Sequence, residues 1–268
     1  MLIGWISDCF LSEGFVGGGE ITESELIKRR HNSIAVSKIT KDNFNTNCDF
    51  YILNNFRTLS KIQLEYLVYE KRYGIAWRDI IDTPHDDFIP ILFANSKFDI
   101  FLSPLHEYSF FEKFDLSYAS EHTRQSFIIP PYFDCKKYIN KNRMPDKDVC
   151  WLGHIQHHKG IDDVLLWARD NDVMVDFYGG GNQQIVNQLL ESKYARYLGH
   201  GDPVEVFKQY ESFIHLPDKV EAFGRSCFEA YLSGCKIIRN DKVGMYSYPL
   251  LDLIDDITEW IESSPKKF

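Results

Sequence analysis

The chain has 268 residues and an ordinary globular composition, with 44% hydrophobic, 26% charged and 15% aromatic residues. Its net charge of -9 at pH 7 argues against binding nucleic acid or an anionic membrane through the overall field, although it leaves room for a local basic patch. The apolar start, MLIGWISDCF, is too short for a signal peptide or a membrane span, and no other window approaches spanning length. We therefore expect a cytoplasmic protein without a membrane span.

Short apolar runs alternate with amphipathic stretches in the first half of the chain. They predict strands at Leu2–Ser7, Ser33–Ser37, Asp49–Leu53, Tyr66–Tyr69, Asp99–Leu102 and Ser126–Ile129, and helices at Ile21–Arg30 and Phe88–Lys97. Residues 131–147 are polar and punctuated by prolines, which predicts an interdomain linker and a boundary near residue 135.

A second series of alternating elements follows this linker. Strands are predicted at Asp148–Leu152, Met174–Tyr178, Tyr194–Leu198, Phe213–Leu216 and Lys236–Ile238, and helices at Ile161–Arg169, Gln183–Glu191, Pro203–Tyr210 and Arg225–Leu232. This alternation predicts an α/β protein of two Rossmann-like domains, residues 1–134 and 135–247, with a cleft at the carboxyl ends of both sheets. The last amphipathic stretch, Tyr248–Ser263, predicts a helix, within residues 248–268, that packs back on the first domain.

Glycine-rich turns follow several of the predicted strands. The turns contain Gly17-Gly18-Gly19-Glu20, Gly153-His154 with Lys159-Gly160, Gly179-Gly180-Gly181 and Gly199-His200-Gly201. Glycines let backbone amides approach a ligand closely, and a helix N-terminus favours an anion, so these turns predict phosphate binding. The alternative for the first of them is a flexible turn. Because His157 and His158 are adjacent and no carboxylate has ligand spacing beside them, a metal site is not expected. The six cysteines form no C-x-x-C pair, so neither zinc nor a disulfide framework is expected.

The strongest pattern runs from Pro217 to Gly234 and contains Glu221 and, eight residues later, Glu229. Glu221 is predicted in the loop before a helix and Glu229 in the second turn of that helix. Two such carboxylates can accept hydrogen bonds from sugar hydroxyls, and amides at the helix start can hold phosphates. The alternative is a solvated acidic helix face.

Taken together, these segments resemble the retaining glycosyltransferases of family four, which have the GT-B fold of two Rossmann-like domains. The resemblance runs over roughly residues 127–244, from Pro130-Pro131-Tyr132-Phe133-Asp134 through Glu221-Ala222-Phe223-Gly224-Arg225 to Val243-Gly244. In the first half it rests on the glycine loop, on Asp49–Asn54 and on Ser103-Pro104-Leu105-His106.

The resemblance implies a role for each matching residue. Glu221 would contact the transferred sugar, Glu229 the ribose hydroxyls, and Lys159 the leaving diphosphate. The remaining donor-binding residues would be Gly18, Gly19, Gly153, His154, Gly179, Gly180, Gly199, His200, Ala222, Phe223, Gly224 and Arg225. His154 stands where the family usually has Arg, and His85 and His106 are candidates for the family's sugar-contacting histidine in the first domain. Such enzymes need neither metal nor cofactor, because Lys and helix amides stabilise the phosphate charge.

The expected function is therefore retaining transfer of a sugar from a UDP- or GDP-sugar to a hydroxyl acceptor such as a saccharide. One alternative acceptor is a hydroxymethylated pyrimidine of phage DNA, for which Lys28-Arg29-Arg30, Lys136–Arg143 and Pro265-Lys266-Lys267 would form a basic patch. Alternatives of another class are a sugar-nucleotide epimerase or hydrolase and a non-catalytic nucleotide-sugar-binding module. Acceptor-dependent release of nucleoside diphosphate separates these readings.

Overall fold

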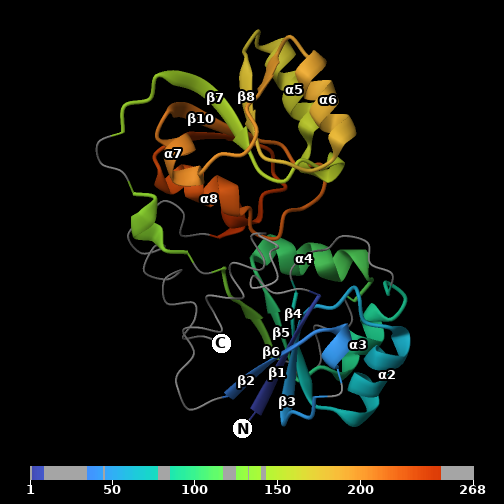
Figure 1. Ribbon diagram of the computed structural model, residues 1–268. Helices are drawn as coiled ribbons and strands as arrows, with labels where there is room; N and C mark the ends of the chain where they lie inside the picture. Colours follow the sequence, from blue (N-terminus) through green and yellow to red (C-terminus); the bar gives the residue numbers. More distant parts are fainter. Residues whose placement is uncertain are drawn as a thin grey trace. The chain divides into compact units, whose positions relative to one another are not determined.

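A computed structural model describes residues 2–8, 35–44, 46–77, 85–116, 125–131, 133–139 and 143–248. The chain divides into two units, residues 1–133 with the segment from Ser247 onward, and residues 134–246. Each unit contains one parallel β-sheet with helices in the connections (Figure 1). The predicted helices at Ile21–Arg30 and beyond Tyr248 lie outside the described residues.

The first unit is built on a six-stranded parallel sheet in the order β2-β1-β3-β4-β5-β6. The strands are β1 Leu2–Ser7, β2 Ala35–Ile39, β3 Phe50–Asn55, β4 Tyr73–Ala76, β5 Phe98–Phe101 and β6 Gln125–Ile128, and the helices are α2 Lys61–Glu70, α3 Ile89–Asn95 and α4 Pro104–Lys113. Successive strand residues face opposite sides of the sheet. Ile6 and Leu53 pack with buried residues of these three helices, whereas Trp5 and Ile52 belong to a smaller apolar cluster.

The predicted strand Tyr66–Tyr69 is wrong, because these residues form the end of helix α2. Ser60 caps this helix and forms a capping box with Gln63, which fixes the helical start before the Tyr-Leu-Val-Tyr run begins. Leu64 and Leu67, three residues apart on the same helix face, are fully buried. Capping and burial at helical spacing thus outweigh the strand preference of this aromatic and β-branched run. Strand β4 and helix α4 were not predicted.

The second unit is built on a five-stranded parallel sheet in the order β11-β10-β7-β8-β9. The strands are β7 Lys147–Leu152, β8 Val175–Tyr178, β9 Ala195–Tyr197, β10 Tyr210–His215 and β11 Lys236–Arg239. The helices are α5 Ile161–Asp170, α6 Gln183–Glu191, α7 Pro203–Phe207 and α8 Arg225–Leu232, and two 3-10 turns, η4 Cys135–Lys137 and η5 His157–Lys159, belong to the same unit.

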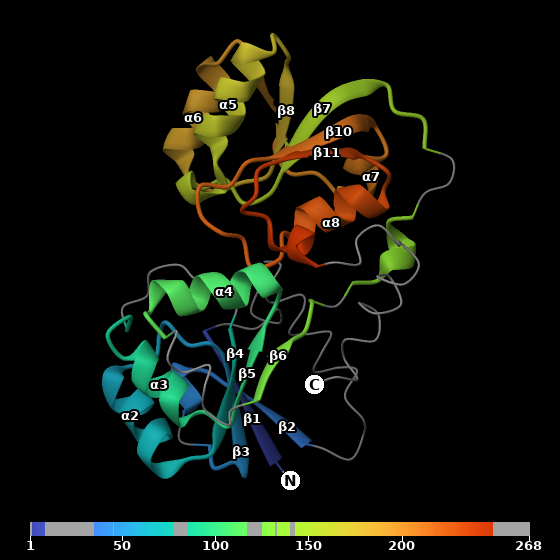
Figure 2. The same ribbon diagram turned by 180° about the vertical axis from the view of Figure 1, so that it is seen from behind.

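Helices cover both faces of this second sheet. Apolar residues of α5 and α6 form one core with strand residues such as Trp151 and Phe177. On the other side Phe207 of α7 packs against Phe213 of β10, with ring centroids 5.3 Å apart. Both views show α5 and α6 on one side of the sheet and α7 and α8 on the other (Figures 1 and 2). No helix within the described ranges has both the length and the apolar character to cross a membrane.

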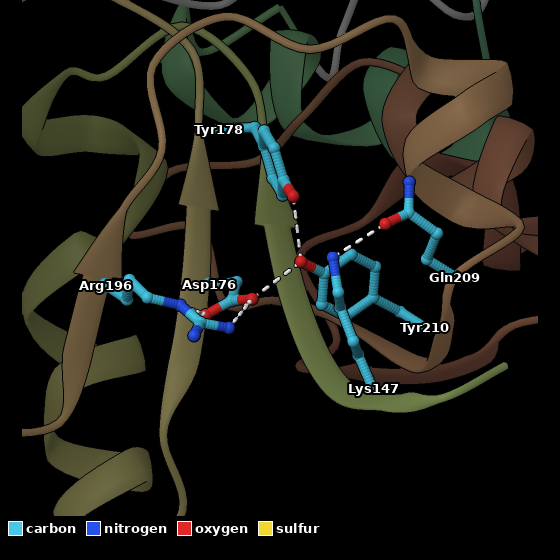
Figure 3. A network of polar contacts seen from close by, with 6 residues as sticks. All are labelled: Lys147, Asp176, Tyr178, Arg196, Gln209 and Tyr210. Atoms are coloured by element: carbon cyan, nitrogen blue, oxygen red, sulfur yellow. Dashed lines mark hydrogen bonds and ion pairs between the residues drawn. The ribbon is translucent and has the colours of Figure 1, made fainter.

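A buried polar network crosses three strands of this sheet (Figure 3). The Tyr210 hydroxyl donates to Asp176 Oδ2 at 2.6 Å and lies 2.8 Å from the Tyr178 hydroxyl, and Arg196 forms two hydrogen bonds to Asp176. Burial, followed by the hydrogen bond to Asp176, raises the pKa of Tyr210 well above its usual range. Since Tyr178 is the last residue of β8, the network fixes the point at which the Gly179–Gly181 loop begins.

We expect Tyr210→Phe to lower the free energy of unfolding by about 1–3 kcal/mol, because Asp176 and Tyr178 each lose a buried hydrogen-bond partner. The measurement is the midpoint of urea denaturation, followed by circular dichroism. Tyr108→Phe is the control, because the Tyr108 side chain is 66% exposed. Equal midpoints for Tyr210→Phe and the wild type would show that the network adds nothing to stability.

Candidate functional site

The glycine turns of the second unit meet at the carboxyl edge of its sheet. The Gly153 amide donates to the Tyr178 carbonyl at 3.1 Å, and the Ile155 amide donates to the Gly180 carbonyl at 2.9 Å. The Gly179 amide donates in turn to the Gly199 carbonyl at 2.7 Å. Parallel strands end at the same edge of a sheet, and these hydrogen bonds join three strand-end loops into one surface.

Two of these glycines are required by contacts between backbones. Gly160 has φ +69, and a Cβ there would lie 1.6 Å from the Leu216 carbonyl oxygen. Gly179 has φ +136, and a Cβ would lie 1.8 Å from the Gly153 carbonyl oxygen. Loop-to-loop packing therefore accounts for both glycines, and donor binding at Gly153, Gly179, Gly180 and Gly199 stays a prediction.

Glu221 is held at this edge by its backbone. Its amide donates to the Lys242 carbonyl at 2.9 Å, and its carbonyl accepts from the Gly244 amide at 3.0 Å, which forms an isolated β-bridge with Val243. The Glu221 side chain is only 15% exposed. The loop thus fixes the backbone of Glu221, and side-chain contacts determine where its carboxylate lies.

The carboxylate of Glu221 forms an ion pair with Lys159, through Oε1 and Nζ. Lys159 ends η5 and is followed by Gly160, which turns the chain into α5. Burial raises the pKa of Glu221, but the charge of Lys159 and the contact with His215 outweigh it and hold this pKa well below its usual range. The structure therefore joins two of the predicted site residues, 62 positions apart in sequence, in a charged centre.

Glu229 lies in the second turn of α8 with its side chain 9% exposed. Arg225 Nη2 is 3.3 Å from Glu229 Oε1, and Tyr138 also influences the same carboxylate. Burial raises the pKa of Glu229 above its ordinary value, and Arg225 and Tyr138 offset only part of that rise. Tyr138 was not predicted as a site residue, because it follows the linker turn η4 and no local pattern points from it to α8.

We expect Glu229→Gln to raise the stability of the folded protein at neutral pH. A carboxyl whose folded pKa is raised stabilises the fold only in acid and destabilises it once it ionises. The melting temperature of the variant should therefore exceed that of the wild type most at neutral pH. This excess should shrink as the pH falls through the folded pKa of Glu229. Melting temperatures from pH 4 to pH 8 measure it, with the exposed Glu191→Gln as control. A lower melting temperature for Glu229→Gln at pH 7 would contradict this account.

The start of α8 lies between the two glutamates. Gly224 caps the helix with φ +89, and a Cβ there would lie 2.7 Å from Val243 Cγ1. Ala222 and Phe223 are buried, and the Phe223 carbonyl accepts from the Met245 amide at 2.7 Å. The first amides of a helix have no partner within the helix and favour an anion. Ala222–Arg225 form the entry into this helix, and phosphate binding by this segment stays a prediction.

Two exposed histidines lie against the Gly179–Gly181 loop. A Cβ on Gly181 would lie 3.0 Å from His154 Cδ2, and one on Gly180 would lie 2.9 Å from His200 Nε2. Each imidazole therefore packs on a glycine of the loop. Their roles beside a donor stay predictions.

The candidate histidines of the first unit are in different surroundings. His106 is fully buried, its Nδ1 accepts from the Leu102 amide at 3.2 Å, and its ring packs edge-on against Phe101. The His85 carbonyl accepts from the amides of Phe88 and Ile89 at the start of α3. These contacts are structural, and sugar contact by either histidine stays a prediction. Gly18 and Gly19 lie outside the described residues.

Within the described ranges, no three His, Cys, Asp or Glu side chains gather as metal ligands. Lys159 and Arg225 each lie beside one of the two glutamates and could offer positive charge to a bound anion.

Solved structures that resemble this chain include glycosyltransferases with the GT-B fold. HepE of Anabaena in complex with UDP-glucose matches 100% of this chain and 94% of its own, with a TM-score of 0.69 and 15% identity. The lipopolysaccharide outer core galactosyltransferase WaaB matches 100% of this chain and 91% of its own, with a TM-score of 0.57 and 14% identity. An α-glucosyltransferase in complex with UDP and a 13-mer DNA containing an HMU base matches 99% and 90%, with a TM-score of 0.57 and 10% identity.

The chain therefore has the α/β GT-B fold, as predicted from the sequence. No protein-family model matches the sequence, and no curated protein matches it. At these identities the similarity establishes the fold alone.

Proposed function

We propose that the protein is a retaining, metal-independent glycosyltransferase that moves a sugar from a UDP- or GDP-sugar to a hydroxyl acceptor. The observation that carries this proposal is the Lys159–Glu221 ion pair beside α8, with Glu229 one turn further into that helix. A cation, a helix start and two partly buried carboxylates match the parts of a nucleotide sugar: diphosphate, sugar and ribose. The fold is shared with structures that hold UDP and UDP-glucose.

Each residue has a defined role in this reaction. Glu221 accepts hydrogen bonds from hydroxyls of the transferred sugar, and Glu229 accepts them from the ribose. Lys159 and the amides at the start of α8 stabilise the charge that develops on the leaving diphosphate. Because Lys159 and Glu221 lie next to each other, a bound donor would have its diphosphate at Lys159 and its sugar at Glu221. The acceptor hydroxyl oxygen bonds to the anomeric carbon on the side that the diphosphate leaves. The bond from that carbon to the diphosphate oxygen breaks, and the diphosphate takes the hydroxyl proton.

The acceptor is a saccharide hydroxyl in this proposal, with a hydroxymethylated pyrimidine of DNA as the alternative. The similarity to the α-glucosyltransferase crystallised with HMU-containing DNA gives the alternative its support. Lys136 and Lys137 are exposed on η4. The clusters Lys28-Arg29-Arg30 and Pro265-Lys266-Lys267 lie outside the described residues.

Release of nucleoside diphosphate, measured with and without acceptor, tests the proposal. UDP-glucose and a GDP-sugar are each incubated with a saccharide panel, with an oligonucleotide containing 5-hydroxymethyluracil, or alone. Release that depends on the saccharides supports the main proposal, and release that depends on the oligonucleotide supports the alternative. Release of equal rate in every arm identifies a hydrolase, and tight binding without release identifies a binding module.

A further inference from the structure

His215 is a buried polar residue behind the candidate site. It is the last residue of β10, and its side chain is only 5% exposed. Its ring stacks on that of Phe213 at a centroid distance of 6.1 Å and an interplanar angle of 19°. Buried polar side chains normally have a hydrogen-bond partner, so the contacts of this imidazole indicate its role.

The polar contact of His215 is with Glu221. His215 Nε2 lies 3.4 Å from Glu221 Oε1, whereas Nδ1, on the other edge of the ring, has no hydrogen-bond partner among the described residues. An ionised carboxylate only accepts hydrogen bonds, so this contact is favourable when the imidazole carries a proton on Nε2. The ring thus leaves one buried nitrogen unsatisfied and directs the other at Glu221.

Glu221 Oε1 is shared between two donors of different kinds. Lys159 reaches it with a flexible side chain that is 27% exposed, whereas His215 reaches it from a buried strand end. The contacts of both residues with Glu221 include Oε1. A donor diphosphate competes for the Lys159 ammonium, because it carries more negative charge than one carboxylate. The contact with His215 is unaffected by that competition.

We infer that His215 is a positioning residue for Glu221, which holds Oε1 when Lys159 turns to the diphosphate and so keeps the carboxylate in place for the transferred sugar. The inference rests on the proposed function. In this inference Glu221 keeps two contacts in the donor complex, the backbone bridge to Val243 and the contact with His215. The contact with Lys159 is the one that changes.

Three variants of His215 test this role. His215→Gln keeps an N–H at the reach of Nε2, His215→Asn has its N–H at the reach of Nδ1, and His215→Phe keeps the ring stack alone. The readouts are the affinity for UDP, which lacks the sugar, and the rate of UDP release from UDP-glucose. Melting temperatures confirm that each variant is folded, and the Gln and Asn pair keeps the comparison intact if His215→Phe does not fold.

We expect UDP affinity to stay within twofold of wild type in all three variants, as a rough limit for an uncontacted site. UDP release should fall about tenfold or more in His215→Asn and His215→Phe and recover largely in His215→Gln. Equal release by Asn and Gln variants, or wild-type release by His215→Phe, would overturn the role of His215 while leaving the transferase intact. A folded wild type that neither binds nor cleaves the nucleotide sugar would overturn the proposed function and this inference together.

Discussion

Replacing Glu221 by Gln is expected to lower kcat for sugar transfer by about 10–100-fold, the range for losing a charged hydrogen bond to the substrate. The affinity for UDP should not fall, because Glu221 is assigned to the sugar and no longer competes with the diphosphate for Lys159. Steady-state rates and UDP titrations on the same protein sample measure both. Glu211→Gln is the matched control, because Glu211 lies on neighbouring strand β10 and is exposed. Wild-type turnover by Glu221→Gln would remove Glu221 from the site.

The same substitution has a defined effect on stability. Because the folded pKa of Glu221 lies below its ordinary value, its ionised form stabilises the fold. That stabilisation is complete above the ordinary value of 4.5 and is lost as the pH falls through the folded value. Glu221→Gln should therefore be less stable than wild type at pH 7, which is the opposite sign to Glu229→Gln. Melting curves of the two Gln variants at pH 7 therefore distinguish the two carboxylates, because one variant should melt below the wild type and the other above it.

Replacing Lys159 by Met is expected to lower both stability and donor affinity. The substitution keeps the apolar stem and removes the ammonium, which leaves the mostly buried charge of Glu221 with His215 alone. Breaking a fully buried pair costs about 3–5 kcal/mol, and the partial exposure here, 27% for Lys159 and 15% for Glu221, reduces the expected loss to about 2–3 kcal/mol. Affinity for UDP should fall about tenfold or more, because the diphosphate loses its charged partner.

A double-mutant cycle with Glu221→Gln isolates this pair. The double variant should be more stable than the sum of the single effects predicts, by about 1–3 kcal/mol. The comparison is Lys208→Met, whose partner Glu205 is 67% exposed and forms an i,i+3 surface pair worth roughly 0–1 kcal/mol. Strict additivity for Lys159 and Glu221 would show that the two charges are not coupled.

Much of the second unit follows from its sequence. Strands β7 and β8 are followed directly by Gly153 and Gly179, where the two loops pack backbone against backbone. These glycines mark the carboxyl ends of the apolar runs before them. All five strands, β7 to β11, overlap the predicted ones. The predicted helix Pro203–Tyr210 is too long, because α7 ends at Phe207 and Tyr210 already begins β10.

The first unit is less predictable, because aromatic side chains obscure its helices. Helix α4 begins with Ser103 as its cap and Pro104 in the first turn, a recognisable start signal. Its Tyr-Ser-Phe-Phe sequence nevertheless has weak helix preference. It is stabilised by the burial of Phe110 against Phe101 and against Trp77, which lies 33 residues earlier in the sequence.

The sequence predicts site residues that face a ligand. In the structure two of them, Lys159 and Glu221, also contact each other. Spacing and type suggest Lys159, Glu221 and Glu229, but no local pattern indicates that Lys159 and Glu221 pair. His215 and Tyr138 have no signal of their own, since each acts through a side chain on another element. Such supporting contacts depend on the tertiary fold and become visible only there.

Binding of UDP and GDP by titration calorimetry, on the wild type and on Glu229→Ala, tests the central claim most directly. The account predicts saturable binding of one nucleotide by the wild type, weakened about tenfold or more in Glu229→Ala because the ribose loses its carboxylate partner. No binding of either nucleotide by the folded wild type, or equal binding by the variant, would contradict a donor site built on Glu221, Lys159 and Glu229.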